Sequence, residues 1–411
     1  MSNTPNIRFK GFTAPWEQRK LGEVFIQTSI IVNPKEDNVE LWSLTVEDGL
    51  TQKTERYSRD FLVKKDDNFK EVRPGYIVYN PMNMTLGAVG YNGMDKSVAV
   101  SGYYTTMITQ EGYDAYYINT WLKSPQAILL YKTYATGSLI EKQRVQFPTL
   151  SIIPVAFPGY EEQKKIGYIF EKLDNLIVLH QRKCDEMSEL KKSMLQKMFP
   201  KKGEHLPEIR FNGFTAPWEQ RKLGEIAVKI GSGKTPLGGK SAYIDKGIPL
   251  IRSQNVNNDR VNFDDVVFID DDTDNSMGNS RVYTNDVLLN ITGASIGRSA
   301  VYKGLEHANV NQHVCIIRPV NSYISDFIQL NLTSDNGQKQ IESSQAGGGR
   351  EGLNFQQIGK MQFMFPTKGE QEQIGVYFNH LNHLVTLHQR KCEELKTIKK
   401  FMLQNMFPQK G

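Results

Sequence analysis

Apolar residues recur at alternating steps of three and four along two stretches of the chain, 161–199 and 370–407. This spacing aligns apolar side chains on one helix face and predicts two long helices that pair through a coiled-coil seam. Pro200 and Pro408 end the pattern, since proline cannot continue a helix. We expect the helices to pair antiparallel, each roughly 60 Å long. The predicted seam positions are Ile166, Phe170, Leu173, Ile177, His180, Cys184, Met187, Met194 and Met198 in the first stretch, and Ile374, Phe378, Leu381, Val385, His388, Cys392, Leu395, Met402 and Met406 in the second.

The remaining sequence alternates Val, Ile, Tyr and Phe with polar residues, which predicts short β-strands. Turn signals occur at Asp48-Gly49, Asn92-Gly93 and Gly238-Gly239. Residues 121–135 and 324–344 are predicted as helices. Each is followed by a loop that contains glycine and then by a strand-like run that ends in Phe-Pro. The pattern therefore predicts an α+β protein.

The chain contains an internal repeat. Residues 7–23 read IRFKGFTAPWEQRKLGE, and residues 209–225 repeat them with one difference, Asn212 in place of Lys10. The two long helical stretches repeat each other as well, and both contain LHQRKC. The segments between, about 24–158 and 226–366, share only a weak frame at an offset of 210.

In this weak frame, Asn80 falls on Asn290 and Gly87 on Gly297. Apolar and glycine positions persist while polar positions change, which is expected of two copies of one fold with different ligands. The alternative is a chance alignment of two β-rich segments. We predict four parts: a β-rich domain at 1–158, a long helix at 159–200, a second β-rich domain at 201–366 and a second long helix at 367–411.

Composition narrows the class of protein. Of the 411 residues, 39% are hydrophobic and 23% are charged, which excludes wholesale disorder. There is no run of about 18 uncharged apolar residues, and the first residues lack an apolar core, so we expect neither a membrane span nor a signal peptide. Cys184, Cys315 and Cys392 form no CxxC pair, which indicates a reducing compartment and a cytoplasmic protein.

Net charge alone does not predict nucleic-acid binding. The 50 basic and 45 acidic residues give a net charge of +5. Each variable segment holds 13 basic and 14 acidic residues, so the excess positive charge lies in the repeated parts. The acidic run Asp270–Asp272 is expected to face away from any polyanion. Binding to DNA would need local patches or partner chains.

Two short motifs are consistent with display of polar side chains in loops. Gly231–Thr235 reads GSGKT, but Val228 stands where a phosphate-binding loop requires its first glycine. We interpret the segment as a glycine-rich turn that presents Ser232, Lys234 and Thr235. Residues 80–83 read NPMN, which resembles the loop of amino-methyltransferases but lacks its second proline and its aromatic residue. We interpret it as a turn that displays Asn80, Met82 and Asn83.

The long helices raise two further possibilities. His180, Cys184, His388 and Cys392 form a potential His₂Cys₂ zinc set, but packing in the seam is the favoured interpretation, so no metal site is predicted. Lysines such as Lys191 and Lys192 could contact phosphates, but 8 basic and 7 acidic residues over 161–200 favour a solvated helix face. No HExxH helix, GxSxG elbow or catalytic dyad is present, so no catalytic residue is predicted.

Asn, Gln, Ser, Arg and Tyr in predicted loops are the candidates for reading bases, since Asn and Gln pair with adenine edges and Arg with guanine. The alternative is ordinary loop polarity. The predicted DNA-binding residues are Asn80, Asn83, Ser101, Tyr103, Lys142 and Arg144 in the first half, and Ser232, Lys234, Thr235, Arg252, Gln254, Asn255, Asn290, Asn311, Gln312 and Arg350 in the second.

The layout resembles a known family over essentially the whole chain. Its motifs are APWEQRKLGE at the start of each half, LHQRKC and MLQ(K/N)MFP in the long helices, EQ(E/K)xIG at the helix starts, and GSGKTP, IPLIRSQNV and DVLLNITGASIGRSAVY in the second variable segment. Together they resemble the specificity subunit of type I restriction-modification enzymes. The resemblance implies two β-rich target recognition domains in pseudo-two-fold repeat, separated by two long antiparallel coiled-coil helices.

The resemblance also implies a function. Each domain is expected to read one half of a bipartite site in double-stranded DNA, while the helices set the spacer and dock two modification (methyltransferase) subunits. Restriction (translocase and nuclease) subunits would join through that complex. The partner subunits are expected to use S-adenosylmethionine, ATP and Mg, with no cofactor bound by this chain. A self-contained adenine methyltransferase and a purely structural coiled-coil adaptor are the competing hypotheses.

Overall fold

The computed structural model describes residues 4–52, 68–137, 143–201, 203–345 and 352–408. It divides the chain into two compact units. Unit 1 comprises residues 1–181 and 390–411, and unit 2 comprises residues 182–389. Each unit contains a sheet-bearing domain and one part of each long helix, so each is described by itself below.

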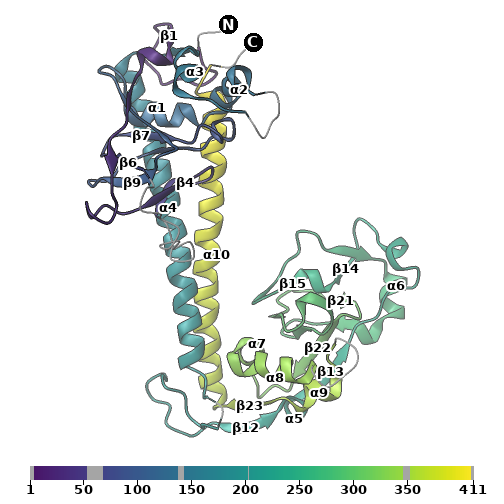
Figure 1. The fold of residues 1–411 in the computed structure, drawn as a ribbon. Coiled ribbons are helices and arrows are strands. Elements are labelled where there is room, and N and C mark those ends of the chain that lie inside the picture. The colour runs from purple at the N-terminus through teal and green to yellow at the C-terminus, as the bar shows by residue number, and fades with distance from the viewer. Residues whose placement is uncertain (1–3, 53–67, 138–142, 202, 346–351, 409–411) are drawn as a thin grey trace. The chain divides into compact units, whose positions relative to one another are not determined.

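The two long helices are α4 (Tyr160–Lys197) and α10 (Lys368–Asn405), shown in Figure 1. Their bounds lie within two residues of the sequence prediction, which is confirmed. In unit 1 the rings of Phe170 and Phe407 stack at 6.1 Å, and Lys399 pairs with Asp174. In these contacts the residue number increases along α4 while it decreases along α10, so the two helices are antiparallel.

The predicted seam of the long helices is also confirmed. Every seam position is buried or half-buried. Cys184 and Cys392 are buried free thiols, as expected of small apolar seam residues. None of the described helices combines the length and the apolar composition that crossing a lipid bilayer requires.

The domain of unit 1 is built on a four-stranded antiparallel sheet in the order β2-β10-β7-β8. Smaller sheets, β3-β6-β9, β4-β5 and β1-β11, complete it. Its elements are β1 (Glu17–Lys20), η1 (Leu21–Glu23), β2 (Phe25–Thr28), β3 (Ile31–Val32), β4 (Trp42–Thr45), β5 (Gly49–Gln52), β6 (Phe69–Val72), β7 (Ile77–Tyr79), η3 (Met84–Leu86), β8 (Val89–Tyr91), β9 (Val98–Ser101), β10 (Thr105–Thr109), α1 (Ala115–Leu122), α2 (Pro125–Tyr134), α3 (Phe147–Ser151) and β11 (Pro154–Phe157).

The domain of unit 2 has a four-stranded sheet with the equivalent order, β13-β22-β19-β20. A second sheet, β17-β14-β21-β18, and the pairs β15-β16 and β12-β23 complete it. Its elements are β12 (Glu219–Lys222), α5 (Leu223–Ile226), β13 (Ala227–Ser232), η5 (Gly239–Ala242), β14 (Ile248–Ile251), η6 (Ser253–Asn255), β15 (Val256–Asn257), β16 (Arg260–Val261), β17 (Val267–Ile269), α6 (Asp271–Ser276), η7 (Gly278–Ser280), β18 (Arg281–Val282), β19 (Val287–Asn290), η8 (Gly293–Ser295), β20 (Ser299–Val301), β21 (Ala308–Val310), β22 (Val314–Pro319), α7 (Ser325–Thr333), α8 (Asp335–Gln345), α9 (Phe355–Lys360) and β23 (Gln362–Phe365).

The weak frame at offset 210 reflects a real equivalence between the two domains. Thr105 pairs with Tyr79 in unit 1, and Cys315 pairs with Leu289 in unit 2, at the same offset. Gly87 and Gly297 both adopt positive φ, at 91° and 87°, after the turn that follows this strand. Because this backbone conformation favours glycine, the glycine survived while its neighbours changed.

The two shorter helix predictions were only partly correct. The helix predicted at 121–135 is mainly α2, with the last two residues of α1 before it, whereas the region 324–344 is a pair of helices, α7 and α8. Ser124 caps α2, with Pro125 at its first position, so the chain must break between α1 and α2. The apolar periodicity continues across this break and hides it.

The repeated segments bind each domain to the start of a long helix. Arg8 donates two hydrogen bonds of 2.7 Å to Glu162, and Arg210 does the same to Glu370. Both glutamates are almost fully buried, at 2% and 0% exposure. The hydrogen bonds to the carboxylates raise the pKa of both arginines above its ordinary value. The residues that are identical in the two halves therefore include both partners of a bidentate ion pair.

This ion pair gives a testable prediction. Replacing Glu370 with glutamine leaves the partly buried Arg210 charge, whose side chain is 15% exposed, without its carboxylate. We expect the free energy of unfolding of unit 2 to fall by about 3–5 kcal/mol. Denaturant unfolding of the full chain measures it, with Glu372→Gln, an exposed position on the same helix, as the control. Equal effects of the two substitutions would contradict the structural role of the pair.

Candidate nucleic-acid interfaces

The sheet topology of unit 2 gathers the predicted loops at one end of the domain. Ser232 at the end of β13 pairs with Cys315 near the start of β22, and Asn290 at the end of β19 pairs with Val314. The end of β14 lies beside the end of β21, with Ile251 next to Val310. The loops that leave these strands therefore converge. They are residues 232–237, 252–255, 291–297 and 311–313.

A chain of hydrogen bonds crosses three of these loops. The Thr235 hydroxyl donates to Gln312 Oε1, and Gln312 Nε2 lies 2.9 Å from His313 Nε2. Since the glutamine amide nitrogen can only donate, His313 Nε2 accepts and its Nδ1–H donates to the Thr292 hydroxyl. Thr235 and Gln312 are exposed, so this network presents polar atoms to solvent in fixed positions.

The loop after β14 is organised by Asp265, a residue that sequence reasoning missed. The Arg252 guanidinium donates to the Asp265 carbonyl at 2.7 Å, and Gln254 and Asn255 both donate to the Asp265 carboxylate. Gln254 is exposed, while Arg252 is half-buried and its Nε atom has no partner. No local signal identifies Asp265, because it lies ten residues beyond Asn255 in the sequence.

Two of the predicted DNA-binding residues, Asn255 and Asn290, are fully buried. The Asn290 amide donates to the carbonyls of Ser253 and Val256, at 2.9 and 3.4 Å. Asn255 Oδ1 accepts from the Arg252 amide at 2.9 Å. In this conformation both side chains hold the loop after β14 in place and present no edge to a ligand.

The other predicted residues of unit 2 lie in or beside the loop cluster. Lys234 is exposed, and Ser232 is half-buried with its hydroxyl bonded to the next carbonyl. Asn311 Oδ1 accepts from the His313 amide at 3.2 Å, so this side chain shapes its own loop. Arg350 lies outside the described residues. Together, the exposed members Lys234, Thr235, Gln254 and Gln312 form the polar edge of this cluster.

The equivalent end of the sheet in unit 1 gathers Asn80, Asn83 and Tyr103. Asn80 follows β7, and Tyr103 precedes β10, whose Thr105 pairs with Tyr79. Asn83 is exposed, Tyr103 is 46% exposed, and Asn80 Oδ1 accepts from the Met82 amide at 3.0 Å. The predicted NPMN turn is confirmed, with Met82 and Asn83 displayed and Asn80 fixing the turn.

Arg144 lies close to this turn in the fold. The chain beside Arg144 bonds to it, since the Val145 amide donates to the Pro81 carbonyl at 3.0 Å. Arg144 and Ser101 are exposed, and Lys142 lies outside the described residues. Lys70 donates to the Tyr104 carbonyl at 2.8 Å and so holds the 101–104 turn. Burial lowers the pKa of Lys70 from its ordinary value.

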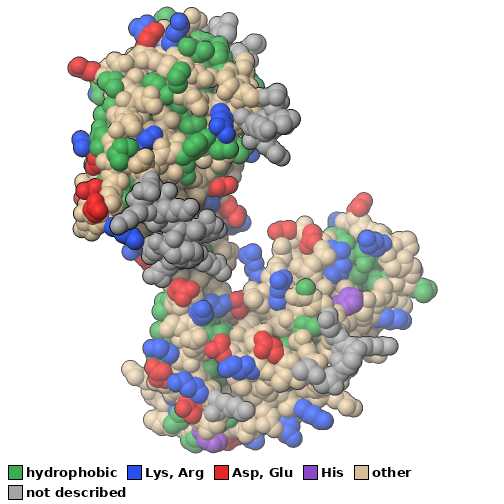
Figure 2. Space-filling model, in the orientation of Figure 1, with side chains coloured by type: hydrophobic (Ala, Val, Ile, Leu, Met, Phe, Trp, Pro, Cys, Tyr) green, Lys and Arg blue, Asp and Glu red, His purple; other side chains and the backbone are tan. Residues whose placement is uncertain are grey.

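The charge on these surfaces is mixed, as the composition indicates. Basic and acidic side chains are interspersed on the surfaces drawn in Figure 2. In the acidic run, Asp270 caps α6 by accepting from the Thr273 amide at 2.8 Å. Hydrogen bonds from the Thr273 side chain and then from its amide lower the pKa of Asp270. Among the described residues, no cluster of three or more His, Cys, Asp or Glu side chains is placed to hold a metal ion.

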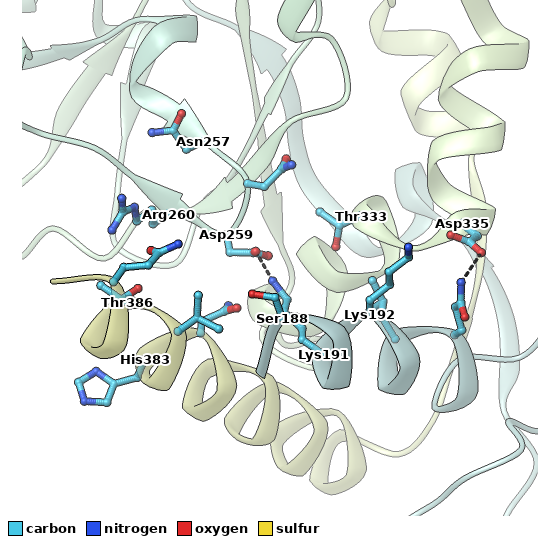
Figure 3. A pocket seen from close by; sticks show the side chains of 16 residues that line it. Ser188, Lys191, Lys192, Asn257, Asp259, Arg260, Thr333, Asp335, His383 and Thr386 are labelled. Atoms are coloured by element: carbon cyan, nitrogen blue, oxygen red, sulfur yellow. Dashed lines mark hydrogen bonds and ion pairs between the residues drawn. The ribbon is translucent and has the colours of Figure 1, made fainter. Parts of the chain in front are cut away.

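Unit 2 also contains a polar groove of about 680 Å³ between its helices and the β15-β16 hairpin (Figure 3). Lys191 pairs with Asp259 on the hairpin, and Gln196 bonds to Asp335 at 3.4 Å. Lys191, one of the lysines weighed for phosphate contact, therefore ties the helix to its domain. Lys192 lines the same groove and is exposed.

Comparison with known proteins identifies the same family as the sequence motifs. Residues 216–397 match the family described as type I restriction modification DNA specificity domain. The type I restriction enzyme MjaVIII specificity subunit of Methanocaldococcus jannaschii is 22% identical over 359 residues, which cover 84% of this chain and 82% of that one. The predicted resemblance to type I specificity subunits is confirmed.

Solved structures share the fold. The S subunit of a type I restriction-modification system from M. genitalium matches 99% of this chain and 100% of its own, with a TM-score of 0.62 and 15% identity. A chain from a structure of complex assembly and conformational transition of the type I R-M system matches 96% of this chain and 99% of its own, with a TM-score of 0.50 and 16% identity. The predicted fold class, α+β with two sheet-bearing domains and two long paired helices, is confirmed.

Gly233 gives a test of the loop cluster. A Cβ atom at this position would lie 1.7 Å from the Val310 carbonyl oxygen, so the two loops touch there through backbone alone. We expect Gly233→Ala to lower the free energy of unfolding of unit 2 by about 1–3 kcal/mol. Gly231→Ala is the matched control, because a Cβ there meets nothing within 4 Å. Denaturant unfolding that shows the same loss for both would contradict the close approach.

Proposed function

We propose that this chain, whose residues 216–397 match the type I restriction modification DNA specificity domain, is the non-catalytic specificity subunit of a type I restriction-modification complex. It reads DNA and directs the chemistry of partner subunits. One observation carries the proposal: two domains with the same sheet order display different polar loops at the same end of the sheet. A shared scaffold with divergent loops suits two readers of different short sequences.

In this proposal each domain reads one half of a bipartite site in the major groove. Gln312, Gln254 and Thr235 supply amide and hydroxyl groups that can pair with base edges, and Lys234 supplies charge for phosphates. In unit 1, Asn83, Tyr103 and Arg144 are the exposed polar side chains that would take this role. The side chains differ between the units, so the two half-sites differ in sequence.

The long helices set the spacing between the half-sites. A helix of 38 residues, such as α4, spans about 57 Å. Half-sites centred about one duplex turn apart require readers about 35 Å apart, which a helix pair of this length accommodates. Bases between the half-sites are then spanned and not read.

Catalysis belongs to the partners. Two modification subunits dock on the repeated parts of the chain and methylate adenine with S-adenosylmethionine, and restriction subunits that use ATP and Mg join the assembly. The duplication supports two copies of one partner, because a two-fold repeated surface offers the same contacts twice. The near-neutral charge of the variable segments suits a reader that larger subunits hold on DNA.

A domain exchange tests the proposal. Residues 24–158 are replaced with the equivalent segment of another specificity subunit, in a host that supplies modification and restriction subunits. Methylated positions are then mapped by single-molecule sequencing. We expect one half-site to change while the other half-site and the spacer stay the same. An unchanged site would favour a structural adaptor, and a changed spacer would contradict the role of the helices.

Single substitutions separate readers from structural residues. In the assembled complex, Gln312→Ala should cost about 1–3 kcal/mol of binding to the native site and relax one base position, because an exposed amide is lost. Asn290→Ala should instead lower the stability of unit 2, since that amide is buried. Binding to duplexes altered at each half-site position measures the first effect. A uniform loss over all sequences would mark Gln312 as a phosphate contact.

A further inference from the structure

The two repeated segments keep residues that folding does not require. Strands β1 and β12 have the same sequence, EQRK, and all eight side chains are exposed. Exposed substitutions usually change stability by less than about 0.5 kcal/mol, so stability alone does not retain such residues. The domains that follow these strands have diverged, so the identity is confined to particular surfaces. A surface kept in duplicate points to one partner bound twice.

The repeated segment of unit 2, at residues 209–225, also lines an apolar pocket of about 630 Å³. Phe211 and Phe214 from the repeated segment form one wall, and Val376 and Tyr377 from α10 form the other. Val376 is 70% exposed, and the two phenylalanines are half-buried. The pocket is bordered by Glu372, Gln373 and His380. Such a pocket fits an apolar side chain of a partner.

Unit 1 has the same aromatic pair in a different charge environment. Phe9 and Phe12 occupy the positions of Phe211 and Phe214, but the Lys165 ammonium lies 5.5 and 5.7 Å from their ring centroids. Lys165 stands where unit 2 has Gln373. Two more lysines of unit 1 replace residues of unit 2 that carry no lysine charge. Lys164 stands where unit 2 has Glu372, and Lys172 stands where unit 2 has His380.

We propose that these aromatic pairs are the two docking sites for the modification subunits, and that the two sites differ in affinity. The proposal rests on the specificity-subunit function. An apolar side chain of the modification subunit enters the open pocket beside Phe214 directly. Beside Phe12 the same side chain must first displace Lys165 from the rings. Loss of the cation–π contact makes the second docking step about two- to fivefold weaker. A complex with one modification subunit, seated on unit 2, therefore forms first.

The experiment titrates the full-length chain with its own purified modification subunit. Native mass spectrometry counts the copies bound, and the two stepwise dissociation constants are fitted. We expect Phe214→Ala to weaken docking on unit 2 by about tenfold or more, so that the first copy binds on unit 1 and the tighter step weakens by only about two- to fivefold; Phe12→Ala should leave the tighter step in place and weaken the other step by about tenfold or more. Leu305→Ser is the control, because Leu305 is 98% exposed and lies outside the repeated segments. It should leave both steps unchanged.

A second test leaves the aromatic rings in place and exchanges the residue that differs between the two sites, which is Lys165 in unit 1 and Gln373 in unit 2. Lys165→Gln should bring the two dissociation constants together, and Gln373→Lys should weaken the tighter step. Both positions are exposed on α4 and α10, so neither substitution threatens folding. The proposed sites would be overturned if both dissociation constants stayed unchanged in the two alanine variants and in the two exchange variants. Failure of the unaltered chain to bind any modification subunit would instead overturn the specificity-subunit function.

Discussion

Burial of a phenylalanine at the C-terminal end of each long helix is the contact on which the rest of the structure depends. Helix α4 begins in unit 1 and ends in unit 2, where Phe199 packs between Trp218 and Phe327. Helix α10 runs the other way, and Phe407 packs against Tyr117 in unit 1. Truncating such a residue costs about 3–5 kcal/mol, which is a large share of the stability of one domain. Unit 2 is a continuous stretch of the chain, whereas unit 1 is complete only when α10 has brought the chain back to it.

This arrangement separates the repeated segments, which hold the scaffold together, from the variable segments, which carry the divergent loops. The repeated segments supply the buried ion pair of Arg210 with Glu370 and its copy in unit 1, and they supply exposed surfaces that are identical in both halves. The variable segments supply a sheet whose order is unchanged and loops whose side chains differ. Loops on a rigid scaffold can change residue by residue without loss of the fold. The proposed recognition of two different short sequences would benefit from this separation.

The sequence predicted which loops form the candidate site more reliably than it predicted which side chains in those loops are exposed. Loop polarity and strand ends identified the segments that converge, including the loops of Gln312 and Gln254. The same reasoning could not separate these exposed amides from Asn255 and Asn290, which are buried. All four are polar and flanked by strands, and burial depends on which loop packs above them. Asp265 was missed because its partners come from a loop that is close only after folding.

The sequence by itself determined the two long helices, their seam, the internal repeat and the equivalence of the two domains. These features follow from periodicity and from identity between segments, which are local properties of the chain. Only the tertiary structure decided that Lys191 pairs with Asp259 and which polar side chains remain exposed. Contacts between residues far apart in sequence depend on where the chain returns, and periodicity within a segment carries no information about that.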